Sequence, residues 1–319
     1  MYDVVALGEL LIDFTTQSID SDGYPTMAAH PGGAPANFLA AIAKFGGKAG
    51  MLGKVGTDTF GKLLTNTLRG AGIETKGLVA ADDVFTTLAF VTLDENGDRE
   101  FAFARKPGAD TQLTFDELDL SLIDETRVFH FGTLSLTDEP ARTTTYRAVE
   151  YAKTHGKLVT YDPNLRKPLW NDLNEAKEQM LWGLRQADVV KISDEEAPRV
   201  AGCLTGCPAA DPGGLCRELL DRRENLEMVI LTEGAEGSRV FTRNRISAYV
   251  IPRGERVRPV DTVGAGDSFT AAFCAMLAAG YDIWPAQAFA SKVAAFVCSC
   301  AGATPEYPAA AKTEFSGNL

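Results

Sequence analysis

Small residues and one carboxylate cluster near the C-terminus, in the run Asp261-Thr262-Val263-Gly264-Ala265-Gly266-Asp267. A Gly-Ala-Gly turn lets backbone N–H groups converge on one point, and the helix expected after it adds the positive end of its dipole. This arrangement suits a phosphate group or the charge that develops during phosphoryl transfer. A carboxylate there would repel an anion unless it takes a proton from an attacking hydroxyl. We therefore predict that Asp267 is a general base and that Gly264, Ala265 and Gly266 form an anion pocket.

Two segments near the N-terminus carry groups that could bind a small polar ligand. Glycines in Gly32-Gly33-Ala34-Pro35-Ala36-Asn37 allow close backbone approach, and the amide of Asn37 both donates and accepts hydrogen bonds. A glycine-rich helix start with a solvated Asn37 explains this run equally well. Asp13 follows the first strand, where ligands bind in open α/β sheets, although a capping or turn role is as common there. A GxGxxG motif is absent from the sequence, which argues against a nicotinamide enzyme.

Length and charge narrow the class of protein. The 319 residues, 45% of them hydrophobic, suffice for one large α/β domain with an appendage or for two domains. A net charge of -12 argues against nucleic acid and anionic membranes as partners. No apolar run reaches the roughly 20 residues that span a bilayer. The N-terminus has an early acid and lacks the basic segment of a signal peptide, so we predict a cytoplasmic protein.

The cysteines are more consistent with reduced thiols than with a metal centre. Cys203, Cys207 and Cys216 are spaced closely enough to ligate a metal, but a second CxxC motif or a histidine pair is missing. The three histidines are scattered along the chain. The role of these three cysteines stays open.

Short apolar segments alternate with segments of helical periodicity, which predicts an α/β fold with a mostly parallel central sheet flanked by helices. The expected strands are Val4–Leu7, Val128–Phe131, Leu158–Tyr161, Val189–Ile192 and Val229–Leu231. The expected helices include Ala34–Phe45, Phe60–Ala71, Arg142–His155, Asn174–Arg185 and Gly214–Arg223.

Two segments, 13–29 and 86–105, break this alternation. The first contains turn residues between alternating stretches, and the second reads as a hairpin around Asn96-Gly97. We predict that both form a small β-sheet lid over the carboxyl ends of the parallel strands. The body would then comprise residues 1–12, 30–85 and 106–319.

Together these segments resemble the carbohydrate kinases of the PfkB (ribokinase-like) family. The N-terminal signature matches Gly32 to Gly46 and then Gly53 to Gly61, and the C-terminal signature matches Asp261 to Phe269. The resemblance spans essentially the whole chain. Within the family the chain is most similar to the fructokinases, through Gly8–Asp13, Asp162–Arg166 with Leu169-Trp170, and Lys191–Glu196.

The resemblance implies a ribokinase-like fold and ATP-dependent phosphorylation of a terminal sugar hydroxyl. It supports Asp267 as the base and assigns sugar binding to Asp13, Gly33, Asn37, Arg105, Asn164 and Arg166. Solvated surface roles are the alternative for both arginines. It assigns nucleotide binding to Lys191, Ser193, Glu196, Thr232, Gly234 and Gly237. Here Ser193 replaces the Asn of the family's NxxE motif, and Thr232–Gly237 could instead be an ordinary glycine-rich turn.

Cations and partners follow from the same resemblance. Glu196 would act on Mg²⁺ through water. Asp261, the backbone of Val263 and Gly302 would hold K⁺, although the end of that loop departs from the family pattern.

The substrate alternatives are 2-keto-3-deoxygluconate, ribose or a nucleoside, and a non-catalytic sugar-binding protein is a weaker alternative. A nucleoside would favour an aromatic platform, for which Phe90, Phe101 and Phe103 are candidates. Alternating apolar residues in the lid predict a homodimer.

Overall fold

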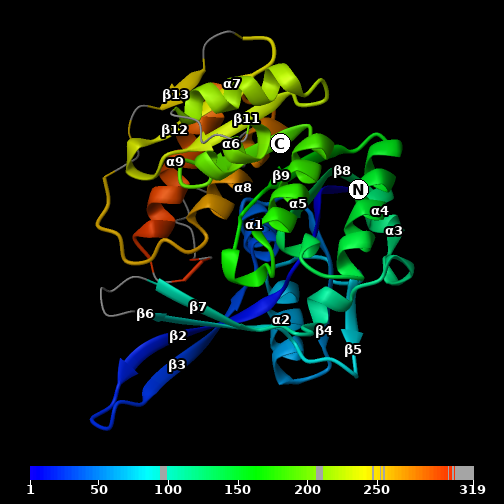
Figure 1. The fold of residues 1–319 in the computed structure, drawn as a ribbon, viewed down its shortest axis with the longest axis vertical. Coiled ribbons are helices and arrows are strands. Elements are labelled where there is room, and N and C mark those ends of the chain that lie inside the picture. The colour runs from blue at the N-terminus through cyan, green and yellow to red at the C-terminus, as the bar shows by residue number, and fades with distance from the viewer. Residues whose placement is uncertain are drawn as a thin grey trace.

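A nine-stranded sheet forms the centre of the larger part of the described structure (Figure 1). The computed structural model describes residues 1–93, 99–205, 211–245, 248–251, 253, 256–300, 302–303 and 305. The strand order is β13-β12-β11-β10-β9-β8-β1-β4-β5, with the β11–β12 and β12–β13 pairs antiparallel and all other neighbouring pairs parallel. The strands are β1 (Tyr2–Leu7), β4 (Ala49–Gly56), β5 (Leu78–Ala81), β8 (Thr126–Gly132), β9 (Leu158–Asp162), β10 (Val189–Ser193), β11 (Met228–Thr232), β12 (Ser238–Thr242) and β13 (Tyr249–Ile251).

Helices cover both faces of this sheet. On one face, a cluster of buried hydrophobic residues packs the sheet against α3 (Leu120–Asp124), α4 (Ala141–Thr154), α5 (Leu173–Gln186), α6 (Ala197–Thr205) and α7 (Pro212–Arg222). The cluster on the other face joins it to α1 (Ala34–Lys44), α2 (Thr59–Gly70), α8 (Ala265–Ala278) and α9 (Ile283–Cys298). Of the helices described, none has both the length and the apolar character needed to cross a bilayer.

The central strands carry apolar residues on both faces, as parallel strands between helical layers must. In β1, Val5 and Leu7 belong to one core cluster, whereas Val4 and Ala6 belong to the other. All five strands and all five helices expected from the sequence are present, with ends that differ by a few residues. The predicted fold class, a mostly parallel sheet between helices, is confirmed.

A second, four-stranded sheet projects from the body (Figure 1), and we call it the lid sheet. Its strand order is β3-β2-β6-β7, and it is reached from the body through four short connections. The strands are β2 (Leu11–Ile19), β3 (Pro25–Gly32), β6 (Leu88–Leu93) and β7 (Arg99–Ala104). The β2–β3 hairpin is longer than the predicted segment 13–29, because β2 begins at Leu11 and β3 ends at Gly32, next to the body. The predicted Asn96-Gly97 turn lies outside the described residues.

Strand register fixes which side chains share a face of the lid sheet. Asp13 pairs with Ala89, and Ala89 pairs with Phe103. Because side chains alternate along a strand and registered neighbours point to the same side, Asp13 and Phe103 lie on one face. Phe14 and Phe90 lie on the opposite face, stacked at 5.3 Å between ring centroids, with Phe60 of α2 edge-on to Phe14. Phe90 is therefore directed away from Asp13 and is a poor candidate for a ligand platform.

The cysteines whose side chains are described are free thiols, of which Cys216 is buried and Cys274, Cys298 and Cys300 are partly buried. Cys216 is buried in α7, and burial raises the pKa of its thiol to about 12. Among the described residues no three His, Cys, Asp or Glu side chains are grouped to hold a metal ion. Cys207 and the side chain of Cys203 lie outside the described residues.

Candidate active site

Asp267 lies in the first turn of α8 and faces the start of α1. The Asn37 side-chain amide donates a hydrogen bond to its Oδ2 atom at 3.1 Å, across 230 positions of sequence. Burial raises the pKa of the Asp267 carboxyl, while the Asn37 hydrogen bond and the charges of Lys191 and Arg166 oppose that rise. The two segments that the sequence analysis singled out separately thus meet at one carboxylate.

The N-terminus of α8 presents backbone donors beside that carboxylate. Gly264 precedes the helix in the left-handed region, with φ of 76°. Within the described residues, the N–H groups of Gly266 and Asp267 have no hydrogen-bond acceptor, and that of Ala265 reaches Thr262 O only at 3.4 Å. Unpaired N–H groups at the positive end of a helix favour an anion. Open N–H groups thus lie where the anion pocket was predicted, and the binding of an anion there stays a prediction.

Lys191 brings a buried positive charge to the same turn. Its ammonium pairs with Asp162 Oδ2 at 3.2 Å, and a Cβ atom added to Gly266 would lie 3.1 Å from it. Burial opposes the charged form, but the carboxylates of Asp162, Glu196 and Asp267 raise the pKa of Lys191 above its ordinary value. Lys191 therefore stays protonated beside the α8 N-terminus.

Asp162 was not assigned a role from the sequence. It ends β9, is buried, and accepts the backbone N–H of Asn164 at 3.1 Å as well as the Lys191 ion pair. Its position at the carboxyl end of a parallel strand is the signal that could have identified it. Asn164 has a φ of 39°, a left-handed conformation that turns the chain directly after this strand.

Glu196 connects the ends of two neighbouring strands. Its Oε1 atom accepts the backbone N–H of Leu165 at 3.0 Å, and its Oε2 atom accepts the N–H and hydroxyl of Ser193 at 3.0 and 2.9 Å. Burial raises its pKa, but Lys191 and these hydrogen bonds lower it below the ordinary value, so the carboxylate is charged. Both oxygens already accept protein donors, which fits contact with Mg²⁺ through water better than direct coordination.

Asp13 lies inside β2 of the lid sheet, so the expectation that it lies at the end of the first strand is wrong, and its carboxyl is near enough to Arg166 of the body for the two charges to interact. Burial raises the pKa of Asp13 to about 6, the Arg166 charge lowers it, and the Asp261 charge raises it. The Arg166 charge also lowers the pKa of Asp267. Within the described part of the chain, Arg166 forms no ion pair. Its guanidinium is therefore available to a ligand between the lid and the body.

The start of α1 is shaped by Gly33. Its φ is 110°, and a Cβ atom there would lie 2.4 Å from the carbonyl oxygen of Glu9. Only glycine fits this position, and the turn it makes presents Asn37 to the site. Glu9 accepts the N–H of Ala34 at 2.9 Å and so holds the turn from below.

The predicted nucleotide segment forms a compact loop after β11. Thr232 lies beside Ser193 in the sheet register, so the two predicted residues are neighbours. Gly234 and Gly237 both have positive φ, of 53° and 99°, and a Cβ atom on Gly237 would lie 2.0 Å from Ile251 O. Glu233 N–H donates to Gly237 O at 2.9 Å and closes the loop.

The residues predicted for K⁺ also come together. Asp261 accepts the N–H of Val263 through Oδ1 at 3.0 Å and the N–H of Gly302 through Oδ2 at 3.2 Å. These contacts join the loop before α8 to the loop after α9. The binding of K⁺ itself stays a prediction.

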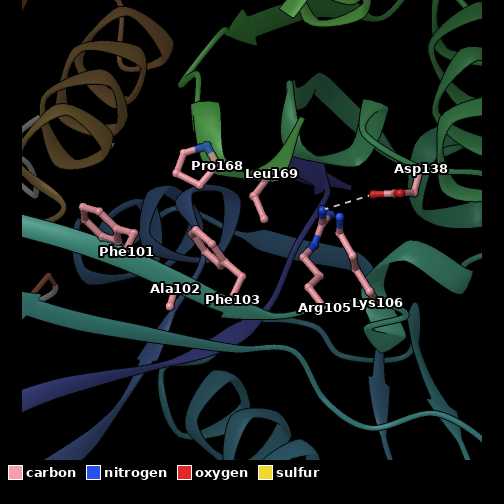
Figure 2. Close-up of a pocket in the computed structure, with 8 residues that line it drawn as sticks. All are labelled: Phe101, Ala102, Phe103, Arg105, Lys106, Asp138, Pro168 and Leu169. Carbon is pink, nitrogen blue, oxygen red and sulfur yellow. Dashed lines mark ion pairs between the residues drawn. The ribbon is translucent and has the colours of Figure 1, made fainter. Parts of the chain in front are cut away.

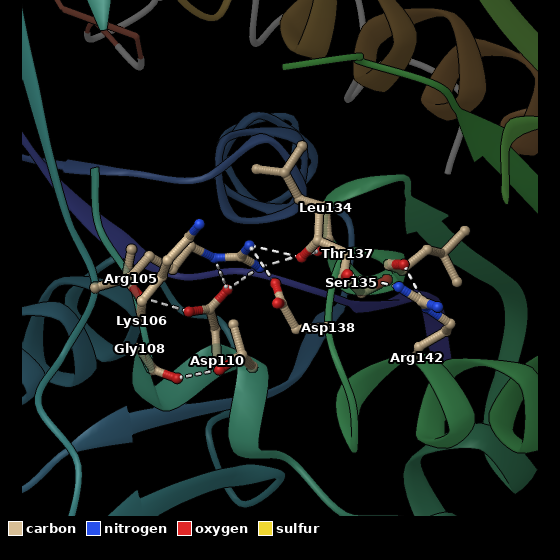
Figure 3. A network of polar contacts seen from close by, with 12 residues as sticks. Arg105, Lys106, Gly108, Asp110, Leu134, Ser135, Thr137, Asp138 and Arg142 are labelled. Carbon is tan, nitrogen blue, oxygen red and sulfur yellow. Dashed lines mark hydrogen bonds and ion pairs between the residues drawn. The ribbon is translucent and has the colours of Figure 1, made fainter. Parts of the chain in front are cut away.

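Arg105, predicted to contact the substrate, is occupied by protein groups (Figure 3). Its side chain is only 2% exposed and pairs with Asp110 through both Nε and Nη2, at 2.9 and 2.7 Å. Further contacts reach Leu134 O, the Thr137 hydroxyl and the Asp138 carboxylate. The alternative of a solvated surface arginine is therefore wrong, and four of the five guanidinium donors are bonded to protein groups.

A cavity of about 190 Å³ adjoins Arg105 between the lid sheet and the body (Figure 2). The rings of Phe101 and Phe103 point from β7 toward Pro168 and Leu169. The two rings are nearly parallel, with centroids 6.3 Å apart. Since Phe103 shares its face of the lid sheet with Asp13, this cavity opens on the side of the predicted sugar site.

His130 is a second residue that the sequence analysis left unassigned. It lies buried in β8, with Nδ1 at 2.9 Å from the Thr160 hydroxyl and its ring stacked 4.3 Å from that of Phe38. Burial, with a contribution from Lys191, lowers the pKa of His130 to about 3. A permanently neutral histidine supports the sheet and α1 and is unsuited to proton transfer near neutral pH.

The chain is similar to proteins of one family throughout its length. The family model that matches residues 1–310 describes pfkB family carbohydrate kinases. Fructokinase-2 of Solanum lycopersicum is 38% identical over 318 residues, which cover 97% of this chain and 94% of that protein. Fructokinase-1 of Zea mays is 41% identical over 271 residues, which cover 84% and 81% of the two chains.

Solved structures agree with these sequence matches. The crystal structure of fructokinase with bound ATP from Xylella fastidiosa has a TM-score of 0.87 at 28% identity, covering 99% of this chain and 98% of that one. A putative ribokinase II from E. coli, in complex with ATP and Mg²⁺, has a TM-score of 0.86 at 25% identity, covering 99% of each chain. With its two predicted signatures meeting at Asp267, the chain belongs to the pfkB family of carbohydrate kinases.

Proposed function

We propose that this chain is a fructokinase, which transfers the γ-phosphoryl group of ATP to a terminal hydroxyl of fructose. The observation that carries the proposal is the contact between Asn37 and Asp267 at the open N-terminus of α8. It joins a group suited to a sugar hydroxyl, a carboxylate suited to accept a proton and unpaired backbone donors suited to a phosphate. The similarity to fructokinases of Solanum lycopersicum and Zea mays supports fructose as the acceptor.

The acceptor would bind between the lid sheet and the body. Asp13 would accept hydrogen bonds from sugar hydroxyls, and Asn37 and Arg166 would donate to its oxygens. The turn at Gly33 would let the backbone approach the ring closely. Asp267 would take the proton of the terminal hydroxyl as that oxygen attacks the γ-phosphorus in line. A lid closed over the sugar would exclude water as a competing acceptor.

Donors on the body would stabilise the phosphoryl group in transfer. The N–H groups of Gly266 and Asp267 would bind its equatorial oxygens, and the Lys191 ammonium would add positive charge beside them. The loop from Thr232 to Gly237 would hold the nucleotide. Mg²⁺ bound to the ATP phosphates would neutralise part of their charge, and the charged Glu196 would hold its water ligands.

One cavity keeps larger acceptors open as a second candidate. Phe101 and Phe103 line it from the lid sheet, and Lys106 contributes a cation at its edge. The ring pair would suit a nucleoside base, whereas the cation would suit the carboxylate of 2-keto-3-deoxygluconate. Fructose is favoured because the fructokinase similarity extends over nearly the whole chain.

A panel of acceptors tests the proposed substrate. The enzyme would be assayed with MgATP and fructose, ribose, 2-keto-3-deoxygluconate or a purine nucleoside, with ADP release as the readout. We expect kcat/KM for fructose to exceed the others by at least about tenfold, in line with hydrogen-bond discrimination between hydroxyl patterns. A higher kcat/KM for any other acceptor would contradict the assignment of fructose. ADP release with none of them would contradict all four candidate acceptors.

As the pH is lowered, activity should be lost at a pH above the ordinary pKa of an aspartate. Protonated Asp267 cannot accept a proton, and protonated Asp13 accepts fewer hydrogen bonds. Burial raises the pKa of both carboxyls, that of Asp13 to about 6. We therefore expect kcat/KM for fructose, at saturating ATP, to fall as the pH drops through an apparent value near 6, well above the ordinary value of about 3.9. A profile that stays flat down to pH 4.5 would contradict both assignments.

The lid sheet also supports the predicted homodimer. Ile19 and Tyr24, at the far end of the β2–β3 hairpin, are 68% and 70% exposed. Large apolar side chains on a projecting sheet are typical of surfaces that another subunit covers. Sedimentation of the full chain across a concentration series would measure the assembly. The cytoplasmic location stays a prediction.

A further inference from the structure

The lid sheet joins the body through four short connections, and buried polar groups link these connections in two pairs. The connections are residues 8–10 between β1 and β2, residue 33 between β3 and α1, residues 82–87 between β5 and β6, and residues 105–108 after β7. Each connection contains, or lies next to, one of these buried polar groups. The groups are Glu9, Ala34 through its backbone, Thr87 and Arg105, with Asp110 from the body.

Arg105 makes four hydrogen bonds within the protein, and its Nη1 atom lies 3.6 Å from Asp138 Oδ2. One Nε donor and one Nη2 donor go to Asp110, the second Nη2 donor goes to Leu134 O, and the Nη1 group faces Thr137 and Asp138. A guanidinium has five donors and no others. In Figure 3 these contacts run from the end of the lid strand to the turn after β8. An arginine with four of its five donors bonded to protein, and the fifth directed at the Asp138 region, holds elements in place and offers little to a sugar.

Asp110 extends the same contact to a second connection. Its Oδ2 atom accepts from Arg105, and its Oδ1 atom accepts the hydroxyl of Thr87. The backbone of this connection is also fixed, because Thr87 O accepts the N–H of Ile12 in β2 at 3.1 Å. One buried carboxylate therefore ties the third connection to the fourth.

Glu9 ties the first connection to the second. Its Oε1 atom accepts the N–H of Ala34 at 2.9 Å, directly after Gly33, while its buried Oε2 atom has no partner among the described residues. Burial raises the pKa of Glu9 to about 7, the Asp110 charge raises it and the Arg105 charge lowers it. The charges of Arg105 and Asp110 therefore act on Glu9, which bonds the turn that presents Asn37.

We propose that Arg105 is a positioning residue, which fixes the lid sheet against the body through Asp110 and thereby places Asp13 opposite Asn37 and Asp267. The proposal rests on the proposed function only where a sugar is used as the probe. A direct sugar contact would make Arg105 act alone. Positioning through Asp110 makes Arg105 and Asp110 act as one unit.

Arg105→Lys and Asp110→Asn, singly and combined, test this. Lys keeps the charge but cannot span Asp110, Leu134 and Thr137 together. Amide hydrogen exchange of the unliganded protein would report the lid peptides 11–32 and 88–104 against body peptides from β8 to β11. We expect each single variant to exchange at least about tenfold faster in the lid peptides alone. The double variant should match either single one within about threefold.

Kinetics with fructose and MgATP supply the second readout. Both single variants should lose at least about tenfold in kcat/KM, without additivity in the double variant. Glu218→Gln is the matched control, because it removes a body ion pair within α7, Arg222 to Glu218 at 2.7 Å, and leaves the lid connections intact. Should Asp110→Asn fail to fold, Thr87→Val removes only the hydroxyl bond to Asp110 and should raise lid exchange in the same peptides.

Three outcomes would overturn the proposal. Unchanged lid exchange with a raised KM for fructose in Arg105→Lys alone would show a direct sugar contact. Unchanged exchange and unchanged kinetics would show that the buried polar groups have no influence on the lid. Additive losses in the double variant would show that the two residues act separately. If neither the native enzyme nor any variant phosphorylated fructose, the proposed substrate would be wrong. The hydrogen-exchange result would still decide whether Arg105 positions the lid sheet.

Discussion

Asp267→Asn is expected to lower kcat by about 10²–10⁴-fold, the usual contribution of a positioned general base. Asn has the same shape as Asp and can still pair with the Asn37 side chain after its amide reorients. It cannot take the proton of the attacking hydroxyl. The terminal hydroxyl would then attack without assistance, while the N–H groups at the α8 N-terminus and the Lys191 charge remain. The KM for fructose and the affinity for ATP should change by less than about threefold.

Steady-state kinetics with fructose and calorimetric titration of the same variant with fructose separate the two effects. Asp116→Asn is a matched control, because the Asp116 side chain is 92% exposed on the body and far from α8 in the sequence. That variant should have native kinetics. If Asp267→Asn turned over normally, Asp267 would not be the base. A loss confined to fructose affinity would make Asp267 a binding residue instead.

The sequence predicted the main elements because buried parallel strands and amphipathic helices have different periods. It did not predict β4, whose residues Ala49–Gly56 include three glycines and read weakly as a strand, although every one of them is buried. The bounds of helix α9 were also not predicted, because its apolar residues surround the axis and give no clear stripe. In both cases tertiary burial decides the structure, and local composition does not report it.

The site was predictable where one short run contains the whole chemistry. Gly264 to Asp267 is such a run, since the turn, the helix start and the carboxylate are adjacent in sequence. Two other contacts depend on which strands are neighbours. They are the ion pair of Lys191 with Asp162 and the hydrogen bond from the Leu165 N–H to Glu196. Their energies come from burial and from partners about 30 positions away. Sequence spacing alone cannot supply either quantity.

Arg105 shows the limit of transferring a role by position. Its place after a lid strand suggested a sugar contact. The structure surrounds it with acceptors from η1 (Ala109–Gln112) and from the turn after β8. An arginine at such a place can serve the substrate or the scaffold, and only the count of its occupied donors distinguishes the two.

Gly264→Ala should lower kcat by about 10²–10³-fold, the cost of losing a donor to the transition-state charge. Two independent obstacles oppose a side chain there. The φ of 76° costs an L-residue about 1–2 kcal/mol. The added Cβ atom would also lie 2.4 Å from Ala303 O and 2.7 Å from Ala303 Cβ. The first turn of α8 must shift to relieve this contact, and the shift moves both the N–H donors and the Asp267 carboxylate.

Gly280→Ala separates strain from displacement. Gly280 follows the other end of α8 with a φ of 86°, and nothing lies within 4 Å of the Cβ position there. Both variants should lose a similar amount of thermal stability from the positive φ, and the clash should add to the loss only at Gly264. Kinetics with fructose and thermal unfolding of both proteins make the comparison. Because only one of the two glycines lies at the N-terminus of α8, a loss of kcat shared by both would indicate general damage to the helix. A native kcat in Gly264→Ala would show that the phosphoryl group is stabilised by groups outside this turn.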